Sequence, residues 1–180
     1  MNRKNQTVNL VMTGLCIAIG IVLPMAFHSV PNAGSVILPM HIPVLLCGLI
    51  CGPIYGLASG ILTPALSSLL TQMPPMAYLP SMLCELAIYG LVAGLAIRLI
   101  RTKSNVANVY LSLVAAMLCG RVIYGVVNAL FFQAGRYSME LWLTASFVTA
   151  LPGIIIQLVA IPVLVLLLQK AGLIRSVQNA

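Results

Sequence analysis

Long apolar stretches alternate with short polar segments along the whole chain. A helix that crosses a bilayer needs roughly 20 apolar residues, because the hydrocarbon core is ~30 Å thick and each helical residue rises ~1.5 Å. The pattern predicts an all-α integral membrane protein, one transmembrane domain over residues 1–180 with six transmembrane helices. The predicted spans are residues 7–27, 38–51, 53–70, 76–100, 106–132 and 141–168.

Two of these spans leave alternatives open. The second is short and begins His41-Ile42-Pro43, which favours a tilted, broken or partly re-entrant helix. Five spans are the alternative count, if two of the shorter stretches form one helical hairpin. The first span follows Arg3 and Lys4, as a signal peptide would. Its length and the poor cleavage site at residues 31–34 favour a transmembrane helix instead.

The composition excludes a soluble protein. Charged residues make up 6% of the chain and hydrophobic residues 61%, with a mean hydropathy of +1.10. A soluble domain carries about a quarter of its residues as Asp, Glu, Lys and Arg. So few charges cannot cover a surface that faces water, so the bilayer must be the solvent.

The distribution of Lys and Arg predicts the orientation. Connections on the cytoplasmic side of a membrane carry an excess of positive charge. With the amino terminus in the cytoplasm, the outer loops hold only Arg136, and both termini are cytoplasmic. The net charge of +7 therefore reflects topology and contact with anionic lipid, and we expect no nucleic-acid partner. The predicted inner residues are Arg3, Lys4, Arg98, Arg101, Lys103, Lys170 and Arg175.

Motifs for catalysis and for nucleotide binding are missing from the sequence. Without a phosphate-binding loop, uphill transport must draw energy from an ion or from another subunit. The chain has no Asp, no HExxH and no GxSxG, so we predict that it is not an enzyme. All five cysteines lie within apolar stretches, with no His or carboxylate near Cys47 and Cys51, so we predict no metal site and no cofactor in this chain.

Small residues recur every four positions in several spans. Small residues at this spacing let helix backbones approach closely in lipid. We predict that the longer runs pack helices within the molecule, whereas Gly14 and Ala18, with Gly20 nearby, suit docking of the first helix on another protein. The longer runs are Gly48, Gly52, Gly56 and Gly60, followed by Gly90 and Gly94.

Two charges lie inside predicted spans. A charge in hydrocarbon costs at least ~2.5–3.5 kcal/mol, so one that is retained usually has a partner and a function. Counting from the outer ends of their spans places Glu85 roughly 10 Å deep and Arg121 roughly 16 Å deep, within reach of each other. We predict an outward-opening cavity beside this pair that binds a small polar molecule; a purely structural ion pair is the alternative. Helical spacing adds Tyr78 and Tyr89 to the face of Glu85, Tyr124 and Asn128 to the face of Arg121, and Gln157 from the sixth span.

The outer loops supply further candidates. Residues 28–34, 38–43 and 71–76 combine prolines, which stiffen a loop, with Met and His side chains. We predict that these loops close over an occupied cavity, and that Met40 and His41 contribute to binding.

These residues also carry a resemblance. The chain resembles the substrate-binding S components of energy-coupling factor (ECF) vitamin transporters, over about residues 14–125. The resemblance rests on Leu38-Pro39-Met40-His41-Ile42-Pro43, Gly52-Pro53-x-Tyr55-Gly56, Leu62-Thr63-Pro64-x-Leu66-Ser67-Ser68-Leu69, Met73-Pro74-Pro75, Glu85-Leu86-Ala87-x-Tyr89-Gly90 and Gly120-Arg121-x-x-Tyr124-Gly125.

The resemblance implies a role and a set of partners. It implies a six-helix S component in the bacterial cytoplasmic membrane that binds a vitamin from outside and topples within the membrane. Its partners would be a transmembrane coupling subunit and two ABC ATPases, which bind ATP and Mg. Gly14 and Ala18 stand at the family's AxxxA-type coupling motif, with Gly in place of the first Ala. Gln72 stands where relatives have Gly before Met-Pro-Pro.

The sequence does not identify the substrate. The sequence looks closest to the pantothenate subgroup and to the pyridoxine and hydroxymethylpyrimidine subgroup. Arg121 would clamp the carboxylate of pantothenate, which we favour, whereas a neutral ring compound fits better if Glu85 neutralises Arg121. A freestanding ion-coupled transporter is the alternative of another class, although no second midplane carboxylate supports it. A membrane enzyme or a purely structural subunit is a further alternative.

Overall fold

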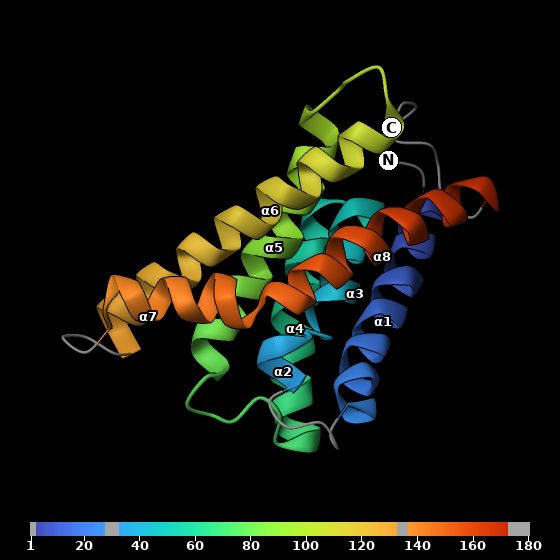
Figure 1. The fold of residues 1–180 in the computed structure, drawn as a ribbon. Coiled ribbons are helices and arrows are strands. Elements are labelled where there is room, and N and C mark those ends of the chain that lie inside the picture. The colour runs from blue at the N-terminus through green and yellow to red at the C-terminus, as the bar shows by residue number, and fades with distance from the viewer. Residues whose placement is uncertain (1–2, 28–32, 133–136, 173–180) are drawn as a thin grey trace.

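The computed structural model describes residues 3–27, 33–132 and 137–172, and the elements in these ranges are all helical (Figure 1). Six helical stretches in this described part are long and apolar enough to cross a membrane. The prediction of an all-α, multi-pass membrane protein with six spans is therefore confirmed. The six stretches are Gln6–Ala26, Gly34–Cys51, Pro53–Thr71, Leu79–Leu99, Asn105–Phe131 and Leu151–Lys170.

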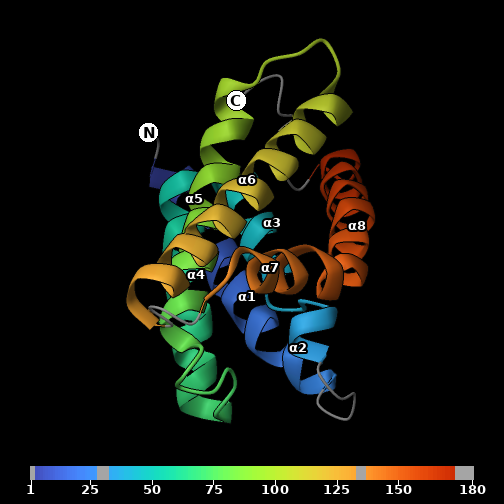
Figure 2. The same ribbon diagram turned by 60° about the vertical axis from the view of Figure 1, so that its left-hand side comes forward.

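Helix α3 lies at the centre of the bundle. It contacts α1, α4, α5, α6 and α8, and Figures 1 and 2 show these helices arranged around it. It can occupy this position because its face is apolar and closely packed, with Val44, Leu45 and Cys47 fully buried. The long helices are α1 (Arg3–Ala26), α3 (His41–Cys51), α4 (Pro53–Thr71), α5 (Leu79–Leu99), α6 (Asn105–Val127) and α8 (Leu151–Lys170).

The second span is broken, one of the forms that its sequence allows. A short helix α2 (Ala33–Val36) precedes α3, and the chain turns between them. Leu38 adopts a φ of 54°, a left-handed conformation that no helix interior contains. The break brings His41 to the first turn of α3, inside the protein rather than at its surface.

The sixth stretch differs from its prediction. Instead of one helix over residues 141–168, the chain forms α7 (Met139–Leu143), the π-helical segment η2 (Thr144–Thr149) and then α8. Pro152 stands in the first turn of α8 and has no N–H to donate to the preceding turn, so a regular helix restarts there. A second π-helical segment, η1 (Asn128–Phe132), ends the fifth span.

Glycines bring α3, α4 and α5 into backbone contact. A Cβ atom added at Gly90 would lie 2.0 Å from the carbonyl oxygen of Gly56, and one at Gly60 would lie 2.2 Å from that of Leu86. Only glycine permits this approach, so the predicted packing role of the repeated small residues is confirmed. Gly52, with a φ of 98°, allows the turn from α3 into α4.

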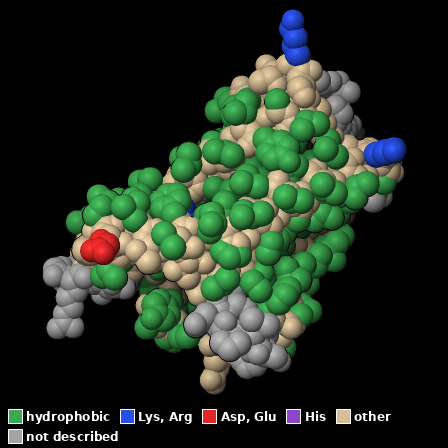
Figure 3. All heavy atoms as spheres, in the orientation of Figure 1, with side chains coloured by type: hydrophobic (Ala, Val, Ile, Leu, Met, Phe, Trp, Pro, Cys, Tyr) green, Lys and Arg blue, Asp and Glu red, His purple; other side chains and the backbone are tan. Residues whose placement is uncertain are grey.

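The outer surface is apolar. Large hydrophobic side chains are exposed on every long helix except α3, and Figure 3 shows them over most of one face. So extensive an exposed apolar surface marks contact with another apolar phase, and the six helices of membrane length indicate lipid. Among the described residues, the buried charged side chains are Glu85 and Arg121.

The start of α1, the α5–α6 connection and the end of α8 lie at one end of the molecule (Figure 1). Arg98, Arg101, Lys103 and Lys170 belong to these segments, and Figure 3 shows basic side chains at that end. Which side of the membrane this end faces stays a prediction. Arg136, Arg175 and residues 28–32 of the first outer loop lie outside the described residues.

The first helix presents part of its small-residue face to the outside. Gly14 and Ala18 are exposed, and a Cβ atom at Gly14 would meet nothing within 4 Å. Gly20 was expected to share this free face, but a Cβ atom there would lie 2.5 Å from Thr63 Cγ2. Gly20 therefore packs against α4, because it lies on the opposite side of α1.

We predict that Gly90→Ala lowers the free energy of unfolding by about 1–3 kcal/mol, because the new Cβ atom pushes α5 away from the α4 backbone. Gly14→Ala, which introduces the same atom into open space, is the matched control. Thermal unfolding in detergent measures both. Equal melting temperatures for the two variants would show that this close contact does not hold the helices together.

Candidate substrate-binding site

A buried ion pair joins α5 to α6. The Nη1 atom of Arg121 lies 2.9 Å from the Oε1 atom of Glu85, and their side chains are 7% and 3% exposed. Pro80 in the first turn of α5 sets the start of that helix and so places Glu85 in its second turn. The two charges face each other inside the bundle, as the sequence predicts.

His41 adds a third titratable group from α3. Its Nε2 atom lies 3.8 Å from the Oε2 atom of Glu85, and its ring meets that of Tyr89 edge to face, with centroids 5.3 Å apart. Tyr89 and Met40 belong to the same apolar core, with 1% and 3% exposure. The structure thus brings His41, Tyr89 and Arg121, from three helices, together at Glu85.

Many polar atoms in this cluster make no well-aligned hydrogen bond within the described part of the protein. These are both ring nitrogens of His41, the Tyr89 hydroxyl, the Oε1 atom of Glu85, and Nε and Nη2 of Arg121. Glu85 Oε1 is thus close to Arg121 without an aligned hydrogen bond. A buried polar group left unsatisfied costs about 1–3 kcal/mol. The cluster is therefore suited to a polar guest that supplies the missing partners.

The remaining predicted residues differ in burial and in hydrogen bonding. Gln157 of α8 is fully buried and both of its amide atoms lack a partner. The amide nitrogen of Asn128 donates instead to the Tyr124 carbonyl oxygen of its own helix, at 2.8 Å. Tyr124 is half-buried, and Tyr78, at the start of α5, is 56% exposed.

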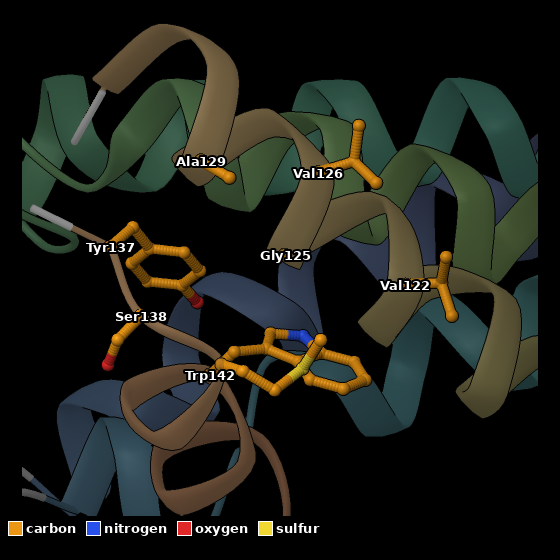
Figure 4. A pocket seen from close by; sticks show the side chains of 8 residues that line it. Val122, Gly125, Val126, Ala129, Tyr137, Ser138 and Trp142 are labelled. Carbon is orange, nitrogen blue, oxygen red and sulfur yellow. The ribbon is translucent and has the colours of Figure 1, made fainter. Parts of the chain in front are cut away.

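Glu85 and Arg121 are buried in this structure, and the cavity that opens outward beside them stays a prediction. A groove of about 340 Å³ lies between α6 and residues 137–142 (Figure 4). Its walls include Val122, Gly125 and Trp142. Access to the ion pair therefore requires a side chain or a segment to move.

Two residues in this region were missed from the sequence. Trp142 donates a hydrogen bond from its indole Nε1 to the carbonyl oxygen of Arg121, at 3.0 Å. The hydroxyl of Tyr137 is buried without a partner. Burial and the negative charge of Glu85 raise the pKa of Tyr137, while Arg121 opposes the shift, so the charges of the pair reach this phenol. The one available signal was that Trp142 is the only tryptophan of the chain.

Comparison with protein-family models decides the identity of the chain. Residues 8–165 match the model for the ECF transporter, substrate-specific component. The chain belongs to this family. Comparison with individually curated proteins gives no match.

As a substrate-specific component, the protein binds a substrate for a transporter and is not an enzyme by itself. Family membership also implies that it associates with other ECF transporter components. The matched range includes α7, η2 and most of α8, which lie beyond the segments that carry the resemblance in the sequence. The groove and the buried cluster both fall within it.

We predict that Glu85→Gln in this substrate-specific component costs about 3–5 kcal/mol of stability, because it leaves the Arg121 charge buried without a counter-ion. Adding Arg121→Met should recover most of that loss, since the double variant leaves no charge buried in the bundle. Melting temperatures of the two single variants and the double variant provide the measurement. Losses that simply add up would mean that the two residues do not act as a pair.

Proposed function

We propose that this substrate-specific component captures a small water-soluble vitamin from outside the cell and delivers it to a transmembrane coupling subunit. Two ABC ATPases on that subunit would bind ATP and Mg and drive the uptake. The observation that carries this proposal is the set of unpartnered polar atoms around Glu85 and Arg121, buried in a member of a substrate-binding family. A pair that served only to join helices would gain by satisfying these atoms within the protein.

The paired charges bear on the choice of vitamin. Glu85 and Arg121 cancel each other at 2.9 Å, so an anionic guest would leave a net charge in a buried site, which is costly. This favours a neutral ring compound such as pyridoxine or hydroxymethylpyrimidine over pantothenate. The free donors of Arg121 and the phenol of Tyr89 suit hydroxyl groups and ring nitrogens.

Contact with the coupling subunit is proposed on the exposed face of α1. Gly14 and Ala18 leave the helix backbone accessible there, and Ala18 lines a shallow apolar groove together with Ile19, Val22 and Leu23. Small residues beside such a groove allow a partner helix to approach closely. Membership of the substrate-specific family argues against a freestanding ion-coupled transporter.

Thermal stabilisation of the purified protein tests the proposed function. At a concentration of 100 times its Kd, a vitamin that binds only the folded state adds about 2.7 kcal/mol, which corresponds to a rise of roughly 5–10 °C in melting temperature. We expect pyridoxine or hydroxymethylpyrimidine to give this rise and pantothenate to give less. A rise with pantothenate alone would reverse the assignment of the substrate.

A variant of the buried pair shows whether the stabilisation comes from this site. We expect the double variant Glu85→Gln/Arg121→Met to fold and to lose the rise with every vitamin, because the donors and the carboxylate are gone. Lys170→Met, which removes an exposed cation at the other end of the molecule, should keep it. Undiminished stabilisation of the double variant would place the binding site elsewhere.

A further inference from the structure

A single tryptophan lines the groove and also bonds to the backbone of a residue of the buried cluster, since Trp142 donates to the Arg121 carbonyl. At 3.6 residues per turn, Gly125 lies about 40° around α6 from Arg121, and Val122 and Val126 follow at about 100° and 140°. Trp142 packs on Gly125, where a Cβ atom would lie 2.4 Å from the indole Nε1. The indole thus contacts α6 at Gly125 and at the Arg121 carbonyl, and Figure 4 shows it in the groove beside Gly125.

The segment that carries Trp142 is held by few interactions. None of the residues of α7 is buried, and Met139, Leu141 and Leu143 are each about half exposed or more. π-helical segments lie before it and directly after it, and such segments often mark functional sites. Trp142 is the main anchor: it donates to the Arg121 carbonyl and meets the ring of Phe147 edge to face at 5.5 Å.

The groove has two polar side chains in its lining, Tyr137 and Ser138, and the hydroxyl of Tyr137 points to a guest rather than to lipid alone. The hydroxyl of Tyr137 is buried at its edge without a partner, and the charges of Glu85 and Arg121 act on it. Tyr124 lies half-buried on α6, one turn from Arg121.

We propose that this groove is the entrance to the Glu85–Arg121 site and that Trp142 is the residue that closes it. When the indole leaves the Arg121 carbonyl and Gly125, the groove connects to the buried donors, and a polar vitamin passes from the Tyr137 hydroxyl to the ion pair. When the indole returns, the vitamin is enclosed. The entrance rests on the proposed function, since it requires a ligand that binds at the pair.

Two variants loosen this closure without changing a residue of the cluster. Trp142→Phe keeps an aromatic ring but removes the indole N–H donor. Gly125→Ala displaces the indole from the other side, and Gly14→Ala, whose new Cβ atom meets nothing within 4 Å, is its matched control. Association and dissociation rates are measured by rapid filtration with tritium-labelled pyridoxine or pantothenate, whichever stabilises the wild-type protein.

A closing residue that the ligand does not touch changes both rates in the same direction. We expect association and dissociation to become roughly three- to tenfold faster in Trp142→Phe and Gly125→Ala, the equivalent of one lost hydrogen bond, with Kd within about twofold of wild type. A merely structural role would lower the melting temperature without changing the rates. The Gly125→Ala variant should also shift the fluorescence of Trp142, the only tryptophan, toward longer wavelength.

Several outcomes would contradict the proposal that this groove is the entrance and that Trp142 closes it. Wild-type rates in both variants would show that Trp142 does not limit access, and a weaker Kd with unchanged association would make it a ligand contact instead. In both cases the wild-type protein still binds its vitamin, so the proposed function stands. A wild-type protein that binds none of the vitamins overturns the proposed function, and the entrance with it.

Discussion

The contact between Glu85 and Arg121 constrains the rest of this protein. Neither charge is tolerable in hydrocarbon alone, so α5 and α6 must meet at the level of the pair, and α3 must cover it with His41. Placing His41 there requires α3 to begin inside the bundle, which the break after α2 makes possible. The attraction joins helices that the hydrophobic effect cannot hold together, because lipid is as apolar as their side chains.

The two halves of the bundle are built differently around this pair. On one side, glycines lock α3, α4 and α5 at backbone distance, which leaves no room for side chains to rearrange. On the other side, α6 and α8 are joined by η1, α7 and η2, whose side chains are largely exposed. Glu85 and Tyr89 therefore lie on a closely packed helix, whereas the residues of α7 that follow are all unburied, and such a division suits a protein that must admit and enclose a ligand.

The unpartnered polar atoms connect the fold to its role. A helical bundle that only had to be stable would pair these groups internally or replace them with apolar ones. Here His41, Tyr89, Arg121 and Gln157 keep free donors and acceptors at 0–7% exposure. Their unmet hydrogen bonds favour association with a polar molecule, and the cancelled charges of the pair favour one that is neutral.

The sequence by itself determined the membrane class and predicted six spans, because hydropathy and span length can be read along the chain. It also placed Glu85 and Arg121 at depths within reach of each other, and the structure shows that they pair. The sequence also determined the packing role of Gly56 and Gly90, since spacing reports which face a small residue occupies. Only the tertiary structure decided that Gly20 faces α4, that Asn128 bonds to its own helix, and that Trp142 donates to the Arg121 carbonyl. These outcomes depend on how far each helix is rotated and where proline interrupts it, and side chains distant in sequence set both.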